Sequence, residues 1–269
     1  MAASFLDDMI ARRKARIAAE YGRLSPADRE RLACCSRPVR DFVGALKRRT
    51  DVAVIAEVKK ASPSVGAIAP ECEAGMQAAH YQDGGAAAIS VLTEPESFGG
   101  SFADLSDVAD GVDIPVLCKD FVVDPVQLFV ARGHGADAIL LMVSVLGADT
   151  GEYVDIAETL GLTPLVEVVD SSELEIALHA GARVVAVNSR DLHTLAMDPV
   201  AARELIAEAA RAGVVVVAAS GTKTRADVSA AARAGADAVL VGESLMREAF
   251  PEDLLEELTG VARKTPVSG

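Results

Sequence analysis

Lysine and carboxylate side chains stand at the ends of short apolar segments in this sequence. Glu57 and Lys59 end the first such segment, Lys119 ends another, and Glu167 lies among aliphatic residues in a third. Alternate residues of a strand share a face, so Glu57 and Lys59 are expected to point the same way. Lysines that face acids, with no histidine among them, indicate proton transfer on a carbonyl or hydroxyl group.

The carboxylate of Glu167 needs a partner, because a buried unpaired carboxylate costs several kcal/mol. We expect a cation or a hydrogen-bond donor across the fold, with Lys119 and Lys59 as candidates. Asn188 and Arg190 form a further pair on one strand face. Two alternatives stay open for these groups: an ion-pair layer that only stabilises the interior, and a Schiff base on Lys119.

The sequence predicts no metal ion and no cofactor. Its four cysteines show no CxxC spacing, and Cys34 and Cys35 are adjacent, which is unfavourable for a disulfide. The histidines lie in helical or loop segments without the spacing of metal ligands; they are His80, His134, His179 and His193.

The pattern of apolar segments predicts a (β/α)8 TIM barrel, because strands that are apolar along their length and reactive at their C-terminal ends build the site of that fold. A doubly wound sheet is the competing architecture, but it normally has a glycine-rich phosphate loop after its first strand, and none is present here. The expected strands are Ala53–Lys59, Ala86–Thr93, Pro115–Phe121, Ala136–Ser144, Pro164–Asp170, Val184–Asp191, Val214–Gly221 and Ala236–Ser244.

The chain divides into two parts within a single domain. Residues 51–269 are expected to form the barrel, and residues 1–50 a helical extension that caps it. In the extension, Ser25 and Pro26 read as the N-cap and first position of a helix.

Composition limits the class of partner. The net charge is −14, which argues against nucleic acid or an anionic membrane but allows a small phosphorylated substrate held by local donors. No apolar run approaches the length of a membrane span. We therefore expect a cytoplasmic protein, and a monomer because no exposed apolar stripe stands out.

Two glycine-containing segments could hold a phosphate group. Ser220-Gly221-Thr222 and Gly242-Glu243-Ser244 follow the seventh and eighth expected strands, where barrels usually bind phosphate through backbone N–H groups.

Six motifs spread over nearly the whole chain resemble the indole-3-glycerol phosphate synthase family. They are Ile55–Ser64, Ile89–Glu94, Cys118–Phe121, Leu165–Val168, Asn188–Leu192 and Val241–Arg247. The resemblance implies closure of an anilino-deoxyribulose phosphate onto its own aromatic ring, with loss of CO2 and water.

The resemblance also implies residue roles. Lys119 would be the general acid and Glu167 the general base, Lys59 and Glu57 would assist proton transfer, and Asn188 would orient the substrate. The anthranilate and ribulose pockets would be lined by Ser62, Phe98, Phe121, Leu140 and Arg190. The phosphate would be held by Lys59, Ser220, Gly221, Gly242 and Glu243, the last through its backbone.

One position departs from the family pattern, which usually has a glutamate directly before the Ser-Gly that follows the seventh strand. Here Ala219 precedes Ser220. Loss of a carboxylate would lower the pKa of a nearby lysine and remove a positioning hydrogen bond. The chain could be a working synthase that tolerates the loss, a paralogue for a modified anthranilate or a related aminoketose phosphate, or a ligand-binding relative without activity.

Overall fold

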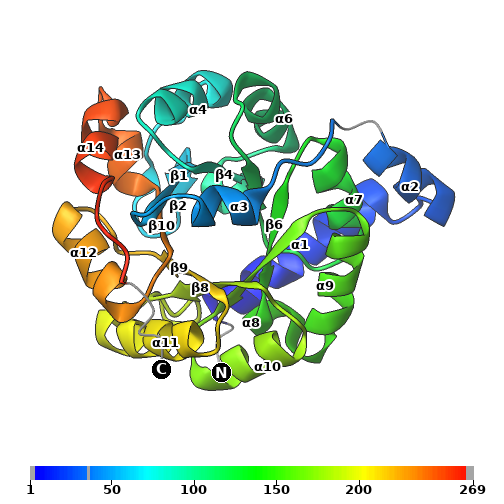
Figure 1. Cartoon of the computed structure of the whole chain (residues 1–269). Coiled ribbons are helices and arrows are strands. Elements are labelled where there is room, and N and C mark those ends of the chain that lie inside the picture. Colours follow the sequence, from blue (N-terminus) through cyan, green and yellow to red (C-terminus); the bar gives the residue numbers. More distant parts are fainter. Residues whose placement is uncertain (1–3, 35–36, 265–269) are drawn as a thin grey trace.

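Eight parallel strands close into a barrel in the computed structural model, which describes residues 4–34 and 37–264 (Figure 1). The barrel order is β1-β10-β9-β8-β7-β6-β5-β4. The strands are β1 (Ala53–Val58), β4 (Ala88–Leu92), β5 (Val116–Lys119), β6 (Ala138–Met142), β7 (Thr163–Val168), β8 (Val184–Asn188), β9 (Val215–Ala219) and β10 (Ala238–Val241).

The predicted TIM barrel is confirmed, and each predicted strand is present. The observed strands are shorter than predicted at one or both ends; β5, for example, ends at Lys119 instead of Phe121. Alternate strand residues, such as Ile55, Leu117 and Leu165, fill the barrel interior, and the others pack against the outer helices.

The connections between strands are mostly helical. The main outer helices are α4 (Ala74–Asp83), α6 (Phe102–Gly111), α7 (Val126–Gly133), α9 (Thr150–Thr159), α10 (Ser171–His179), α11 (Pro199–Arg211), α12 (Arg225–Ala234) and α14 (Pro251–Leu258). The shorter elements are the β2 (Ala61–Ser62) and β3 (Gly66–Ala67) hairpin, α5 (Pro95–Phe98), α8 (Val143–Leu146), the 3-10 helix η1 (Gly147–Asp149) and α13 (Glu243–Arg247).

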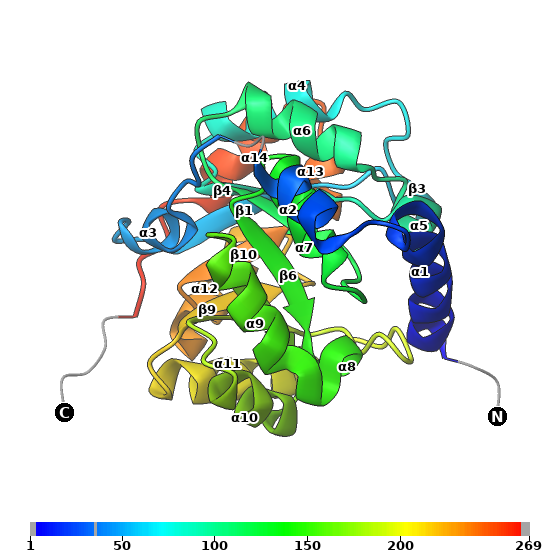
Figure 2. The ribbon, with the colours of Figure 1, turned by 90° about the vertical axis from the view of Figure 1, so that its right-hand side faces the viewer.

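Within residues 4–34 and 37–52, three helices precede the barrel: α1 (Phe5–Tyr21), α2 (Pro26–Cys34) and α3 (Phe42–Lys47). Figure 2 shows α1 at the end of the barrel toward which β6 points, and α3 at the opposite end. Leu6 and Met9 of α1, and Phe42 and Leu46 of α3, belong to the same buried cluster as the barrel interior. Both ends of the barrel are therefore closed in part by residues that precede its first strand.

A buried ion pair fastens α1 beside the barrel mouth. Arg13 is 3% exposed and donates to both carboxylate oxygens of Asp120, at 2.9 and 2.5 Å. Thr93 donates to the same carboxylate at 2.7 Å. Because Asp120 directly follows Lys119, this contact links α1 to a strand end that carries a candidate catalytic lysine.

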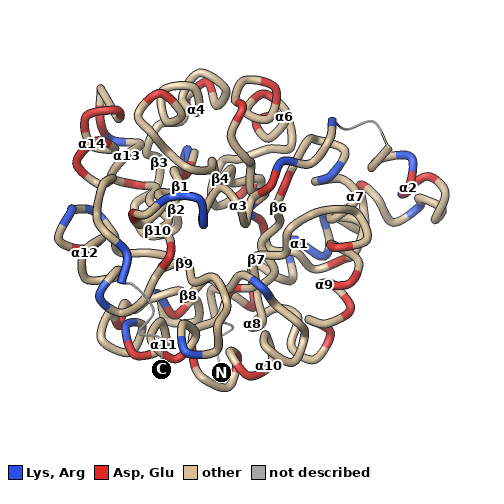
Figure 3. The backbone as a smooth tube through the Cα atoms, in the orientation of Figure 1, with Lys and Arg blue, Asp and Glu red and all other residues tan. Residues whose placement is uncertain are grey.

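Charged residues are spread over the outside of the barrel. Figure 3 shows acidic positions on outer helices such as α9 and α14. Within residues 4–34 and 37–264, no helix is long and apolar enough to cross a membrane, and no cluster of His, Cys, Asp or Glu is suited to hold a metal ion. In the same part of the chain Cys34, Cys72 and Cys118 are free thiols, whereas Cys35 lies outside the described residues.

Candidate active site

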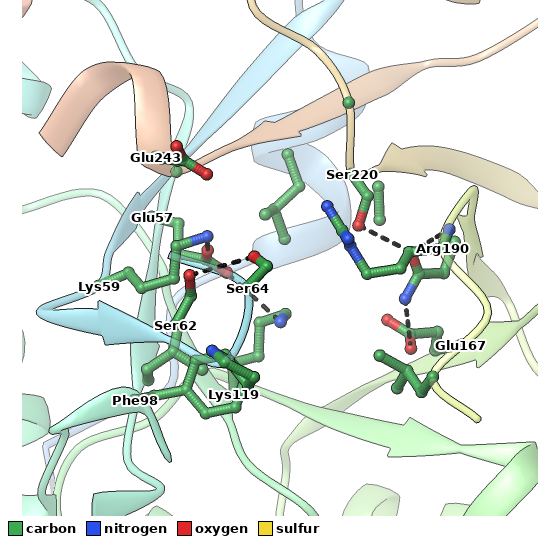
Figure 4. A pocket seen from close by; sticks show the side chains of 18 of the residues that line it. Glu57, Lys59, Ser62, Ser64, Phe98, Lys119, Glu167, Arg190, Ser220 and Glu243 are labelled. Carbon is green, nitrogen blue, oxygen red and sulfur yellow. Dashed lines mark hydrogen bonds and ion pairs between the residues drawn. The ribbon is translucent and has the colours of Figure 1, made fainter. Parts of the chain in front are cut away.

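One cavity of about 400 Å³ opens at the C-terminal ends of the barrel strands. Every residue for which the sequence predicted a role lines it (Figure 4). These residues are Glu57, Lys59, Ser62, Phe98, Lys119, Phe121, Leu140, Glu167, Asn188, Arg190, Ser220, Gly221, Gly242 and Glu243.

Glu57 lies between Lys59 and Lys119 of the cavity. Its Oε1 is 3.0 Å from Nζ of Lys59, and its Oε2 is 3.4 Å from Nζ of Lys119. The second contact is an ion pair without good hydrogen-bond geometry. Gly242 makes room for this group, because a Cβ atom at that position would come within 2.4 Å of the carboxylate.

The opposite charges of Glu57 and Lys119 each favour the ionised form of the other residue. Burial alone would raise the pKa of Glu57, but the Lys119 and Lys59 ammonium groups outweigh it and lower that pKa below its usual value. Burial alone would lower the pKa of Lys119, but the carboxylates of Glu57 and Glu167 outweigh it and raise that pKa. Glu57 is therefore held as an anion and Lys119 as a cation.

Glu167 has a different partner from the one expected. The sequence suggested Lys119 or Lys59, but both lysines pair with Glu57, and Asn188 on the adjacent strand donates Nδ2–H to Oε1 of Glu167 at 3.0 Å. The Asn188 carbonyl oxygen accepts from the Ser220 hydroxyl at 2.7 Å and from the backbone N–H of Arg190 at 3.0 Å.

Burial decides the titration of Glu167. It raises the pKa of this carboxyl above the usual value, although the positive charge of Lys119 and the Asn188 hydrogen bond act in the opposite direction. Glu57 and Glu167 are thus two carboxyl groups of one cavity whose pKa values are shifted in opposite directions. Paired groups whose environments separate their pKa values are typical of acid–base sites.

Aromatic and aliphatic side chains form one wall of the cavity. The rings of Phe98 and Phe121 are tilted by 47° with centroids 6.2 Å apart, and Leu140 is buried in the same wall. Glu94 holds Phe98 in place, because its carboxylate accepts the backbone N–H groups of Glu96, Ser97 and Phe98 at the start of α5. This wall suits a flat apolar ring.

The loops after β9 and β10 supply the donors of the opposite wall. Ser220 and Gly221 have φ values of 65° and 82°, so the backbone turns sharply after β9. Only Gly221 adopts this conformation without cost. After β10, the hydroxyl of Ser244 is buried and has no hydrogen-bond partner among the described residues.

Ala219 ends β9 and is 4% exposed. It lies beside Asn188 of β8 and Leu240 of β10 in the strand register, and it lines the cavity. The departure from the family pattern therefore falls on the cavity wall. Even without a carboxylate at this position, Glu57 and Glu167 keep the pKa of Lys119 raised.

Sequence reasoning missed part of the cavity lining. Phe5 from α1 and Leu192, Leu195 and Met197 from the loop after β8 also face the cavity. The Ser4 hydroxyl, which caps α1, lies 2.9 Å from Nδ1 of His193 in that loop. No local pattern identified these residues, because their role depends on where α1 lies.

Comparison with known proteins establishes the family. The sequence profile described as indole-3-glycerol phosphate synthase matches residues 6–258. The chain belongs to the indole-3-glycerol phosphate synthase family. It is 47% identical over 256 residues to indole-3-glycerol phosphate synthase 1 of Streptomyces coelicolor, with 95% of this chain and 94% of that protein covered. It is 44% identical over 260 residues to indole-3-glycerol phosphate synthase of Mycobacterium tuberculosis, with the same coverage.

Solved structures with low sequence identity share the fold of this synthase-family chain. A mutant tryptophan synthase α-subunit from Pyrococcus furiosus superimposes with a TM-score of 0.61 at 18% identity, over 78% of this chain and 98% of that one. A thiamine phosphate pyrophosphorylase from Pyrococcus furiosus gives a TM-score of 0.58 at 17% identity, over 81% and 96%. At these identities the likeness concerns the barrel alone.

Proposed function

We propose that this cavity closes 1-(2-carboxyphenylamino)-1-deoxyribulose 5-phosphate to indole-3-glycerol phosphate, with release of CO2 and water. The chain is a carbon–carbon lyase of tryptophan biosynthesis. The observation that carries the residue roles is the buried Glu57 between Lys59 and Lys119, in the cavity that also holds Glu167. The named relatives favour this reaction over one on a modified substrate and over a role in binding alone.

Lys119 is the general acid in this proposal. Ring closure turns the ketone oxygen of the substrate into a hydroxyl, so a proton donor must stand beside that oxygen. The raised pKa of Lys119 keeps its ammonium group protonated in the free enzyme. The same charge stabilises the negative charge that develops on the oxygen as the carbon–carbon bond forms.

Glu167 is the general base. After CO2 has left, dehydration removes a proton from the adjacent carbon and the new hydroxyl as water, and an ammonium group of Lys59 or Lys119 supplies the proton that this hydroxyl needs to leave. A carboxylate whose pKa is raised by burial is a stronger base than an exposed one, which suits Glu167 to this step. Glu57 keeps Lys119 charged and holds both Lys59 and Lys119 by ion pairs, and Asn188 orients both Glu167 and the substrate.

The substrate is expected to lie across the barrel mouth. Its anthranilate ring would pack on the wall of Phe98, Phe121 and Leu140, and Ser62 and Arg190 would line the rest of the ring and ribulose pockets. The phosphate would bind Lys59 and the loops at 220–221 and 242–243. The Ser244 hydroxyl, which has no hydrogen-bond partner among the described residues, adds a donor at this end of the cavity.

We also propose that the chain works in the cytoplasm as a monomer, with residues 1–50 as an extension that caps the barrel. The free thiols of the described chain suit a reducing compartment.

Replacement of Lys119 tests the proposal against its chemical rival. Lys119→Met should lower kcat by roughly 10² or more, the effect of losing a positioned acid, and should change KM much less. Lys60→Met is the matched control, because Lys60 forms its ion pair with Asp104 outside the cavity at 2.6 Å. The control should retain most of the turnover, measured by indole fluorescence.

A Schiff base on Lys119 would require an unprotonated amine, and such lysines have a lowered pKa. The raised pKa of Lys119 opposes that chemistry. Borohydride treatment during turnover should leave the enzyme unmodified. Substrate trapped covalently on Lys119 would overturn the assignment of this residue as the acid.

A further inference from the structure

The hydroxyl of Ser220 is bonded to another side chain of the cavity. It donates its single hydrogen to Oδ1 of Asn188 at 2.7 Å, and Asn188 donates Nδ2–H to Oε1 of Glu167 at 3.0 Å. Figure 4 shows these contacts as a row of dashed lines between Ser220 and Glu167. The serine that follows β9 is thereby connected, through Asn188 of β8, to the proposed base on β7.

The direction of these hydrogen bonds fixes the orientation of the Asn188 amide. Its oxygen accepts from two donors, the Ser220 hydroxyl and the backbone N–H of Arg190, so its NH2 group is left to face Glu167. If the amide were flipped, its NH2 would face the N–H of Arg190 and its oxygen would face a carboxylate. Both contacts would be repulsive.

The hydrogen bond from Ser220 to Asn188 also limits how Ser220 could bind the phosphate group of the substrate. A serine hydroxyl has one hydrogen to donate, and a phosphate dianion accepts hydrogen bonds. In the described arrangement the hydrogen of Ser220 is used by Asn188. Backbone N–H groups of this turn remain suited to a phosphate, but the Ser220 side chain does not.

The backbone at Ser220 points to a function for its side chain. Its φ of 65° is in the left-handed region, which is costly for any residue except glycine. Among the described residues, only Leu195 is a second non-glycine residue with positive φ. A strained conformation that is kept with a side chain attached suggests that the side chain is needed.

We propose that Ser220 is a positioning residue, whose hydroxyl holds the Asn188 amide so that its N–H is directed at Glu167. This inference rests on the proposed function, in which Glu167 is the general base. Ser220 acts through Asn188 and does not itself touch the reacting atoms.

The expected consequence is a change in pH dependence. The Asn188 hydrogen bond favours the charged form of Glu167, so a weaker bond raises the pKa of that carboxyl. Since the base must be ionised to act, the acidic limb of kcat/KM then moves to higher pH. A hydrogen bond to a charged group corresponds to a shift of about one unit. The other titratable groups that interact with Glu167 are Lys119 from β5, Glu57 from β1 and Glu173 from α10, whose pKa is raised to about 7 mainly by burial, and replacement of Ser220 leaves all three in place.

The experiment compares two replacements of Ser220 with a neighbouring control. Ser220→Ala removes the hydroxyl, and Ser220→Gly removes it and also relieves the backbone strain. Ser189→Ala removes a neighbouring hydroxyl, directly after β8, whose partners are the backbone oxygens of Ala219 and Ser220 and the sulfur of Met197. We expect both Ser220 variants to lower kcat and move the acidic limb up by about one unit, with KM little changed. Ser189→Ala should leave the limb in place.

Two further variants separate the possible failures. In an Asn188→Ala background, Ser220→Ala should produce no additional shift, because the link is already broken. Glu167→Gln should abolish the acidic limb together with most of the turnover; if it does not, the proposed base is wrong and the inference falls with it. If Glu167→Gln behaves as expected but the Ser220 variants raise KM without moving the limb, Ser220 binds phosphate and the positioning role is refuted. Recovery of full activity in Ser220→Gly would also refute that role.

Discussion

Removal of the negative charge of Glu57 should make Lys119 lose its proton at a lower pH. Glu57 is 2% exposed and its Oε2 lies 3.4 Å from the Lys119 ammonium group. Glu57→Gln keeps the shape of the side chain but leaves two ammonium groups facing an uncharged amide. The carboxylate favours the protonated lysine, so its loss lowers the pKa of Lys119 and moves the alkaline limb of kcat/KM toward neutral pH.

The size of the effect follows from the distance. Two unit charges 3.4 Å apart interact by about 5 kcal/mol at an effective dielectric constant of about 20. The Lys119 side chain is 20% exposed, and solvent screening reduces this figure, so about half is expected to remain. That corresponds to a downward movement of the alkaline limb by about two pH units.

The assay is kcat/KM over the neutral and alkaline range, followed by indole fluorescence. Glu57→Asp serves as the control, because it keeps the charge and should keep most of the alkaline limb while losing some turnover through the shorter reach. Thermal unfolding of both variants would show that the barrel is intact. An alkaline limb in Glu57→Gln that stays at its original pH, or moves upward, would refute the electrostatic account of Lys119.

Two further changes test other parts of the structure. Ala219→Glu should raise kcat by roughly two- to tenfold, the effect of one added hydrogen bond of about 1 kcal/mol. Ala219→Gln, which has a side chain of similar size but no charge, should show how much of that gain is due to the charge. Loss of activity in Ala219→Glu would instead show that the cavity requires a small residue at this position. Arg13→Met should lower the free energy of unfolding by about 3–5 kcal/mol in urea denaturation, because it leaves the buried Asp120 carboxylate without its cation. Arg13→Met combined with Asp120→Asn should recover part of that loss, and a single variant as stable as the wild type would contradict the assigned role of the ion pair.

The sequence predicted the barrel correctly, and the residues to which it assigned roles line one cavity of that barrel. Apolar runs that end near Glu57, Lys119 or Asn188 predict two things about these side chains. The alternation along a strand predicts which side chains point into the barrel, and their place at the strand end predicts that they lie at its mouth. In a closed parallel barrel all such ends meet at one mouth. Local sequence patterns were therefore enough to predict that these residues lie in one cavity.

Pairing within the cavity was decided by the tertiary structure. The sequence suggested that a lysine would face Glu167, but strand order and register place both lysines on Glu57 and give Glu167 the amide of Asn188. Which side chains meet across a barrel depends on the relative position of strands far apart in the chain. No local pattern carries that information.

In the N-terminal extension, too, the sequence predicted the helices but not their contacts with the barrel. Its apolar spacing and the Ser25-Pro26 start predicted helices, and α1 and α2 are present. That Phe5 would face the cavity and Arg13 would pair with Asp120 depended on the docking of α1 across the barrel mouth. Helix formation follows from short-range spacing and capping, which the sequence contains directly, whereas docking follows from the shape and charge of a surface that exists only after the barrel has closed.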